Sequence, residues 1–193
     1  MMTGERHGEG PPGLDLVRLH GFLQDACPGL VDGHLSASLI AGGKSNLTYA
    51  VTDGAARWIV RRPPLGHVLA TAHDMAREYR VMSALQGTGV PVPRMIVLCE
   101  DPDVVGEPCY LMEHVVGHAY RQAEQLRPIG ERRTGQIARN MVDTLLTLHE
   151  VEPASVGLAD FGRPERFLER QVRRWKQQLD ASQTRALPRA ELL

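Results

Sequence analysis

The residue run of this chain best suited to binding a phosphate group consists of Gly42, Gly43, Lys44, Ser45 and Asn46. Glycines let backbone N–H groups approach a phosphate closely, and the three polar side chains add hydrogen-bond donors. Glycine, serine and asparagine are also the usual residues of an ordinary hairpin loop. Taken alone, the run therefore favours a hairpin loop, and its interpretation as a phosphate site depends on the rest of the chain.

A basic residue at the end of a later strand-like segment could contact the same phosphate. The segment 57–62 reads RWIVRR, so either Arg61 or Arg62 could supply the charge. A guanidinium group presents a planar set of donors that fits phosphate or carboxylate. Considered alone, such a residue is more often a solvated charge on an edge strand.

Glu78 could be the partner of that base. It lies three residues after Met75 and four before Met82, on the apolar stripe of a predicted helix. A carboxylate on the inward face of a helix usually has a partner, because an unpaired buried charge is costly. The alternative is a helix phased differently, with Glu78 as a capping or surface residue.

A strand that runs into a polar linker is the fourth feature. Residues 110–115 read YLMEHV and lead to Gly117, a pattern that also fits a plain strand end. The order of glycine loop, basic third strand, helix glutamate and hinge-like strand resembles the N-terminal lobe of the protein-kinase-like fold. In that lobe the strand-three base contacts the nucleotide phosphates and is held by the helix glutamate. Backbone groups just past the hinge strand contact the adenine edge.

Apolar periodicity predicts the elements that must position these residues. A helix is predicted over 14–27, where Leu16, Leu19 and Leu23 recur at helical spacing. Strands are predicted over 35–41, 47–52, 57–62, 94–99 and 109–112, with a helix over 71–85 and a hairpin turn at Asp53-Gly54. Two further helices are predicted from apolar stripes. The first stripe consists of Ile137, Met141, Leu145 and Leu148. The second helix would begin at Pro164, and its stripe consists of Leu168, Val172, Trp175 and Leu179. The expected fold class is α+β, a five-stranded antiparallel sheet with one packed helix that leads into a helical region.

Composition narrows the class of protein. Of the 193 residues, 42% are hydrophobic and 23% charged, which is typical of a soluble globular protein. The 22 basic and 23 acidic residues leave a net charge of -1, which gives no electrostatic basis for a nucleic-acid or membrane partner. Cys27, Cys99 and Cys109 form no CxxC pair, so a reducing compartment is favoured over a disulfide framework or zinc site. With no leader pattern and no apolar run near the roughly 20 residues that span a bilayer, we expect a cytoplasmic protein.

Six segments resemble a known family: GGKSNLTYAV, WIVRRPP, AREYRVMSAL, VPVPRMIVLC, YLMEHVVG and LLTLHEVEP. They are similar to the aminoglycoside phosphotransferase (choline-kinase-like) superfamily, and most of all to the branch whose kinase domains are fused to, or encoded near, acyl-CoA dehydrogenases. The similarity covers residues 35–179. It implies a kinase-like N-terminal lobe over 14–116 and the first helices of an incomplete C-terminal lobe over 117–193. Residues 1–13 are rich in glycine and proline and have almost nothing to bury, so we expect them to form a flexible tail.

The resemblance also implies a ligand, ATP, with magnesium in the full-length enzyme. By position, the nucleotide contacts would be Gly42, Gly43, Lys44, Ser45 and Asn46 in the loop, Arg61 with its partner Glu78, and Glu113 and Val115 at the hinge. Most kinase-like folds carry lysine where this chain has Arg61. The resembled branch often carries arginine there, so we interpret Arg61 as a subfamily trait that could alter nucleotide geometry.

The catalytic loop that the resemblance implies is not found. That loop carries a His-Gly-Asp triplet, whose Asp acts on the attacking hydroxyl, and an Asn for magnesium, and a later Asp holds the metal. No His-Gly-Asp occurs in the sequence. The remaining candidates, Asp143, Asp160, Asp180 and His149, lie in no metal-like pattern. Because phosphoryl transfer depends on positioning and charge neutralisation, we expect this chain alone to be inactive.

Three functions remain open at this stage. The first is the ATP-binding portion of a phosphotransferase that acts on a small-molecule hydroxyl, with hydroxyacyl-CoA or a related metabolite favoured over an aminoglycoside as acceptor. The second is a non-catalytic nucleotide-binding or partner-docking module, which would bind a separate C-terminal lobe or self-associate. The third is nucleic-acid binding by a basic helix. It is less favoured, because the charges of such a helix more often form a solvated face; the residues concerned are Arg166, Arg170, Arg173, Arg174 and Lys176.

Overall fold

The computed structural model describes residues 10–40, 46–66, 74–162 and 165–182. The chain divides into two compact units, Met1–Val151 and Glu152–Leu193, and each is described by itself. In the described part of the chain, no helix combines the length and the apolar character needed to cross a membrane.

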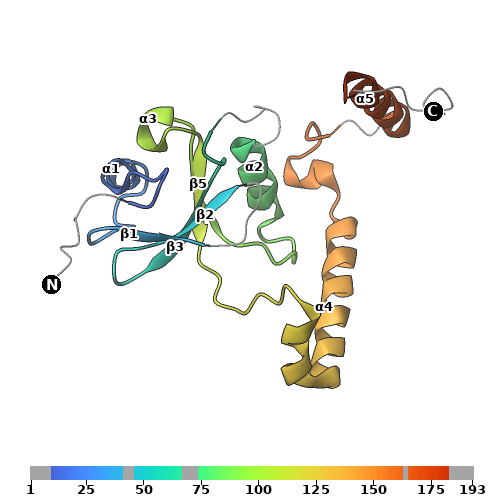
Figure 1. Ribbon diagram of the computed structural model, residues 1–193, viewed down its shortest axis with the longest axis horizontal. Coiled ribbons are helices and arrows are strands. Elements are labelled where there is room, and N and C mark those ends of the chain that lie inside the picture. Colours follow the sequence, from blue (N-terminus) through green and yellow to red (C-terminus); the bar gives the residue numbers. More distant parts are fainter. Residues whose placement is uncertain (1–9, 41–45, 67–73, 163–164, 183–193) are drawn as a thin grey trace. The chain divides into compact units, whose positions relative to one another are not determined.

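A five-stranded antiparallel sheet forms the centre of the first unit (Figure 1). Its strands are β1 (Ser36–Leu39), β2 (Leu47–Thr52), β3 (Arg57–Arg62), β4 (Met95–Cys99) and β5 (Cys109–Glu113). Their order in the sheet is β1-β2-β3-β5-β4, and every neighbouring pair is antiparallel. The predicted α+β architecture with five antiparallel strands is confirmed, and β2 and β3 have the predicted bounds.

The turn between β2 and β3 is built around Asp53 and Gly54. The Asp53 carboxylate accepts hydrogen bonds from the N–H groups of Ala55 (2.9 Å) and Ala56 (2.8 Å). Gly54 has a φ of 96°, a left-handed conformation that favours glycine. A turn at this site is confirmed, but the connection is a four-residue loop held by an aspartate side chain.

Helices α1 (Leu16–Ala26) and α3 (Pro102–Val105) cover one face of the sheet (Figure 1). Asp15 caps α1 by accepting hydrogen bonds from the N–H groups of Val17 and Arg18. The short helix α3 lies between the strands predicted over 94–99 and 109–112, in a segment for which no helix was predicted. The core on this face includes Leu19 and Leu23 of α1, Val104 and Val105 of α3, and Trp58, Val60 and Leu111 of the sheet.

Helix α2 (Met75–Leu85) covers the opposite face (Figure 1). Met75, Met95 and Tyr110 form the buried cluster there, whereas Leu111, the next residue of β5, belongs to the cluster under α1. Successive side chains of a strand point to opposite faces, so β5 contributes to both cores. The helix predicted over 71–85 is confirmed from Met75 onward, and 71–73 lie outside the described residues.

The remaining elements are helical. In the first unit, η1 (Ala123–Ile129) precedes the long helix α4 (Gly130–Glu150). The second unit contains η2 (Pro153–Val156) and α5 (Phe167–Ser182). Both helices predicted from apolar stripes are therefore present, while Pro164, the predicted helix start, lies outside the described residues. The lobe boundary expected after residue 116 stays a prediction.

Candidate functional site

Arg61 of β3 and Glu78 of α2 form an ion pair on the α2 face of the sheet. The Arg61 Nε atom lies 3.1 Å from Glu78 Oε2, and each side chain is about one third exposed, at 33% and 35%. The Nε–H is not directed at the oxygen, so the contact is electrostatic and is not a hydrogen bond. Of the two arginines that the sequence left open, Arg61 is the one that reaches Glu78.

Two further donors reach the Glu78 carboxylate. The Asn46 side-chain amide donates to Oε1 (3.0 Å), and the Tyr110 hydroxyl donates to Oε2 (3.0 Å). Burial raises the pKa of Tyr110, and the negative charge of Glu78 raises it further. Tyr110 therefore stays protonated, and remains a donor, throughout the neutral pH range.

Tyr110 was not among the residues that sequence reasoning assigned to the site. The signal that could have found it is the alternation of β5, which places Tyr110 on the same face as Met112. The sequence does not predict that β5 pairs with β3, and it is this pairing that places Tyr110 directly opposite Arg61. This register brings the tyrosine and the arginine to one face of the sheet.

Arg62 lies on the other face, under α1 and α3. It is only 4% exposed, and its guanidinium donates to the backbone carbonyls of Gly13, Pro63 and Val105. Tyr49 donates nearby to the carbonyl of Pro12 (2.6 Å). Pro12 and Gly13 of the expected tail are thus bonded to the sheet, and Arg62 has a structural position.

The predicted nucleotide loop is described only at its end. Gly42, Gly43, Lys44 and Ser45 lie outside the described residues. Asn46 is 6% exposed and immediately precedes β2. Its bond to Glu78 therefore places the end of the loop beside the Arg61–Glu78 pair.

The predicted hinge residues lie at the end of β5. Glu113 is the last residue of the strand, and its N–H donates to the carbonyl of Arg94 (2.9 Å). Its carboxylate is 4.0 Å from Arg94 Nε. Val115 follows in the linker and is 63% exposed. Glu113 is three residues along β5 from Tyr110, which corresponds to about 10 Å of strand.

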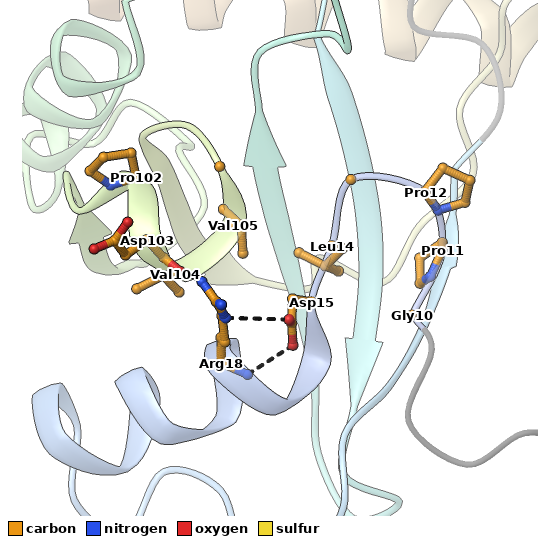
Figure 2. Close-up of a pocket in the computed structure, with 12 residues that line it drawn as sticks. Gly10, Pro11, Pro12, Leu14, Asp15, Arg18, Pro102, Asp103, Val104 and Val105 are labelled. Atoms are coloured by element: carbon orange, nitrogen blue, oxygen red, sulfur yellow. Dashed lines mark hydrogen bonds and ion pairs between the residues drawn. The ribbon is translucent and has the colours of Figure 1, made fainter.

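A cavity of about 480 Å³ lies away from these residues, between the N-terminal segment 10–15 and α3. Figure 2 shows Arg18 and Asp15 at its edge, where they form an ion pair of 3.6 Å. Arg18 also donates to the carbonyl of Asp103 (2.6 Å). Because this cavity lies on the α1 face of the sheet and its one arginine is paired, it is not part of the Glu78 site.

A metal site is not evident in the described ranges. Among these residues, no group of three or more His, Cys, Asp or Glu side chains is placed to hold a metal ion. Asp143 lies in α4, and Asp160 and Asp180 lie in the second unit. No residue of the described chain is therefore assigned to magnesium.

Comparison with known proteins identifies the family. Residues 36–193 match the profile of the family described as "Phosphotransferase enzyme family". The chain is 37% identical to "Acyl-CoA dehydrogenase family member 11" of Gallus gallus over 180 residues, which are 91% of this chain and 23% of that protein. It is 36% identical to "Acyl-CoA dehydrogenase family member 10" of Mus musculus over 151 residues, which are 78% of this chain and 14% of that protein.

A solved structure shows the same fold. It is a candidate aminoglycoside phosphotransferase from Ralstonia eutropha, with a TM-score of 0.73 and 32% sequence identity. The match covers 90% of this chain and 50% of that structure. The chain thus spans half of the solved protein and less than a quarter of these two acyl-CoA dehydrogenase relatives. On the profile match, the identity and the shared kinase-like α+β fold, this chain belongs to the phosphotransferase enzyme family.

Proposed function

We propose that this chain is the ATP-binding portion of a phosphotransferase that transfers a phosphoryl group from ATP to the hydroxyl of a small molecule. The observation that carries the proposal is the pairing of Arg61 with Glu78 beside the end of the glycine-containing loop. A cation held by a helix carboxylate next to such a loop is the arrangement that binds nucleotide phosphates in kinase-like enzymes.

Each part of the proposed site has its own task. The guanidinium of Arg61 would contact the phosphates, because its Nε lies beside Glu78 while a third of the side chain remains exposed. The loop formed by Gly42, Gly43, Lys44, Ser45 and Asn46 would add N–H donors. Backbone groups at Glu113 and Val115 would contact the adenine edge.

The chemical step is assigned to residues outside this sequence. No His-Gly-Asp triplet occurs in it, and the described residues hold no metal-like cluster. Magnesium would neutralise charge on the transferred phosphoryl group in the complete enzyme. The described residues would bind and orient the nucleotide, and the chain alone is proposed to be inactive.

The test is ATP binding by this chain, measured as a shift in melting temperature and by titration calorimetry. We expect R61M to weaken ATP binding by roughly tenfold or more, since it removes a charge-assisted contact to phosphate. The matched control is R57M, which removes an exposed arginine from the start of the same strand. The proposal would be refuted if ATP bound neither to this chain nor to a longer protein that contains the remaining lobe.

The acceptor proposed for the complete enzyme is a hydroxyacyl-CoA or a related hydroxylated metabolite. Support comes from the relatives, whose names identify them as acyl-CoA dehydrogenase family members. The solved relative is instead named for aminoglycosides. ATP consumption by the longer protein with each acceptor class decides between them, and turnover with aminoglycosides alone would overturn this choice.

A second candidate function, partner docking, is favoured by the surface of α4. Five of its apolar side chains are 40% to 69% exposed, namely Met141, Val142, Leu145, Leu146 and Leu148. Helices with such a stripe normally bury it. The occupant we propose is the remaining helical lobe of the phosphotransferase, because this chain covers only half of the solved relative.

The docking proposal is tested with the chain by itself. We expect binding of a dye that reports exposed apolar surface, and loss of that binding when the missing lobe is added as a separate polypeptide. Light scattering distinguishes self-association, in which two copies cover the stripe, from docking of the lobe. A monomer that binds no dye would contradict both arrangements.

A further inference from the structure

The Glu78 carboxylate is bonded through both of its oxygens. Oε1 accepts a hydrogen bond from Asn46 and Oε2 accepts one from Tyr110, each at 3.0 Å. The donors come from different parts of the first unit, since Asn46 immediately precedes β2 and Tyr110 lies within β5. A carboxylate bonded at both oxygens from two directions cannot rotate freely.

Arg61, in contrast, has no directional bond to Glu78. Its Nε is 3.1 Å from Oε2, but the N–H makes no hydrogen bond in the described part of the chain. An arginine side chain has much rotamer freedom to lose when it is held in one geometry. The orientation of the Arg61 guanidinium therefore depends on where Oε2 is held.

Tyr110 is well placed to hold Oε2. It is 1% exposed, and its ring lies 6.2 Å from that of Tyr79, centroid to centroid. It is also the residue directly opposite Arg61 in the β3–β5 register. Directly opposite side chains share a face of the sheet, so the tyrosine hydroxyl and the arginine reach the same carboxylate oxygen.

We propose that Tyr110 and Asn46 are positioning residues, which hold the Glu78 carboxylate and through it orient Arg61 toward the nucleotide phosphates. The inference rests on the proposed ATP-binding function. Neither residue needs to touch the phosphates in this role. Asn46 also connects the end of the nucleotide loop to the same carboxylate.

The test compares Y110F with Y79F. Both variants remove one hydroxyl from the pair of contacting rings, but only the Tyr110 hydroxyl donates to Glu78 in the structure. We expect Y110F to weaken ATP binding about three- to tenfold and to leave adenosine binding unchanged, because adenosine has no phosphate for Arg61. We expect Y79F to change neither. An equal loss of ATP and adenosine binding in Y110F would show a general structural defect and overturn the inference.

A double-mutant cycle tests whether Tyr110 acts through Arg61. In the R61M background, Y110F should cause no further loss of ATP affinity, since the residue to be oriented is gone. If Y110F weakens ATP binding by the same factor with and without Arg61, the tyrosine acts independently and the inference is wrong.

A spectroscopic measurement separates this inference from the proposed function. The ¹⁵N resonance of Arg61 Nε and the hydrogen exchange of its proton report the order of the guanidinium without nucleotide. We expect faster exchange in Y110F and N46A than in Y79F. If the exchange changes as expected but the parent chain binds no ATP, the positioning is supported and the ATP function fails. Unchanged exchange in both variants overturns the positioning.

Discussion

Arg61 and Arg62 are consecutive residues of β3 whose guanidinium groups lie on opposite faces of the sheet. Arg61 faces α2 and pairs with Glu78 at 3.1 Å. Arg62 is 4% exposed and donates to backbone carbonyls, among them those of Gly13 and Val105. Arg61 thus remains partly exposed beside Glu78, whereas Arg62 connects the N-terminal segment and α3 to the sheet.

Substitution of the two arginines should separate stability from ligand binding. We expect R62M to lower the free energy of unfolding by about 2–4 kcal/mol, because buried carbonyls lose their charged donor. We expect R61M to lower it by less than about 1 kcal/mol, because that ion pair is partly exposed. Urea denaturation measures both. Equal stability of R62M and the parent chain would contradict the structural position of Arg62.

The buried tyrosines should make the fold sensitive to alkali. Burial raises the pKa of both Tyr49 and Tyr110, and the positive charge of Arg62 partly opposes the shift at Tyr49. Because the pKa of each tyrosine is higher in the folded state, its contribution to the free energy of unfolding is complete below about pH 10, the pKa of tyrosine in the unfolded chain. That contribution is lost as the pH rises through the pKa of the folded state. Absorbance at 295 nm should show a late-titrating component that is reduced in Y110F and in Y49F. If neither substitution changes the titration curve, the assignment is wrong.

The cysteines should differ in reactivity. Cys99 and Cys109 are directly opposite each other on β4 and β5, and both are buried. Burial is the main cause that raises the pKa of Cys109 to about 12, and burial also raises the pKa of Cys99. Because the thiolate is the reactive form, we expect a thiol reagent to modify the partly exposed Cys27 first in the native protein, and the other two only on unfolding.

Peptide mapping after brief labelling checks this order. The control variant C27S should show almost no fast labelling under native conditions. Rapid modification of Cys99 or Cys109 in the folded chain would mean that β4 and β5 open far more readily than their packing indicates.

The turn at Asp53 should weaken in acid. Its carboxylate accepts from Ala55, Ala56 and, at 3.2 Å, from the N–H of Asp32, and these backbone bonds lower its pKa. Because the pKa of Asp53 is lower in the folded state, its carboxylate contributes to the free energy of unfolding above about pH 4, the pKa of aspartate in the unfolded chain. That contribution is lost as the pH falls through the pKa of the folded state. We expect D53N to have a lower melting temperature than the parent chain at pH 7. The difference should shrink toward pH 3, and a constant difference across this range would count against the mechanism.

Local patterns in the sequence were enough to predict most of the elements. The alternation of β2 yields its bounds, because one buried face imposes a period of two on neighbouring residues. The end of β3 follows from Pro63-Pro64, because proline cannot continue strand pairing. The position of Glu78 on an inward helical stripe likewise follows from the spacing of Met75 and Met82. Helix α3 was missed because four residues are too few to show a helical period.

The composition of the Glu78 site was decided by the tertiary structure. Whether Arg61 or Arg62 meets Glu78 depends on which face of β3 receives α2, and the apolar residues on both faces of that strand leave the question open. Tyr110 joins the site only because β5, nearly fifty residues further along the chain, pairs with β3 in a register that places it opposite Arg61. Periodicity is a property of neighbouring residues and can be detected in the sequence. The choice of which strands become neighbours depends on how the whole chain buries its apolar surface, so it appears only in the folded structure.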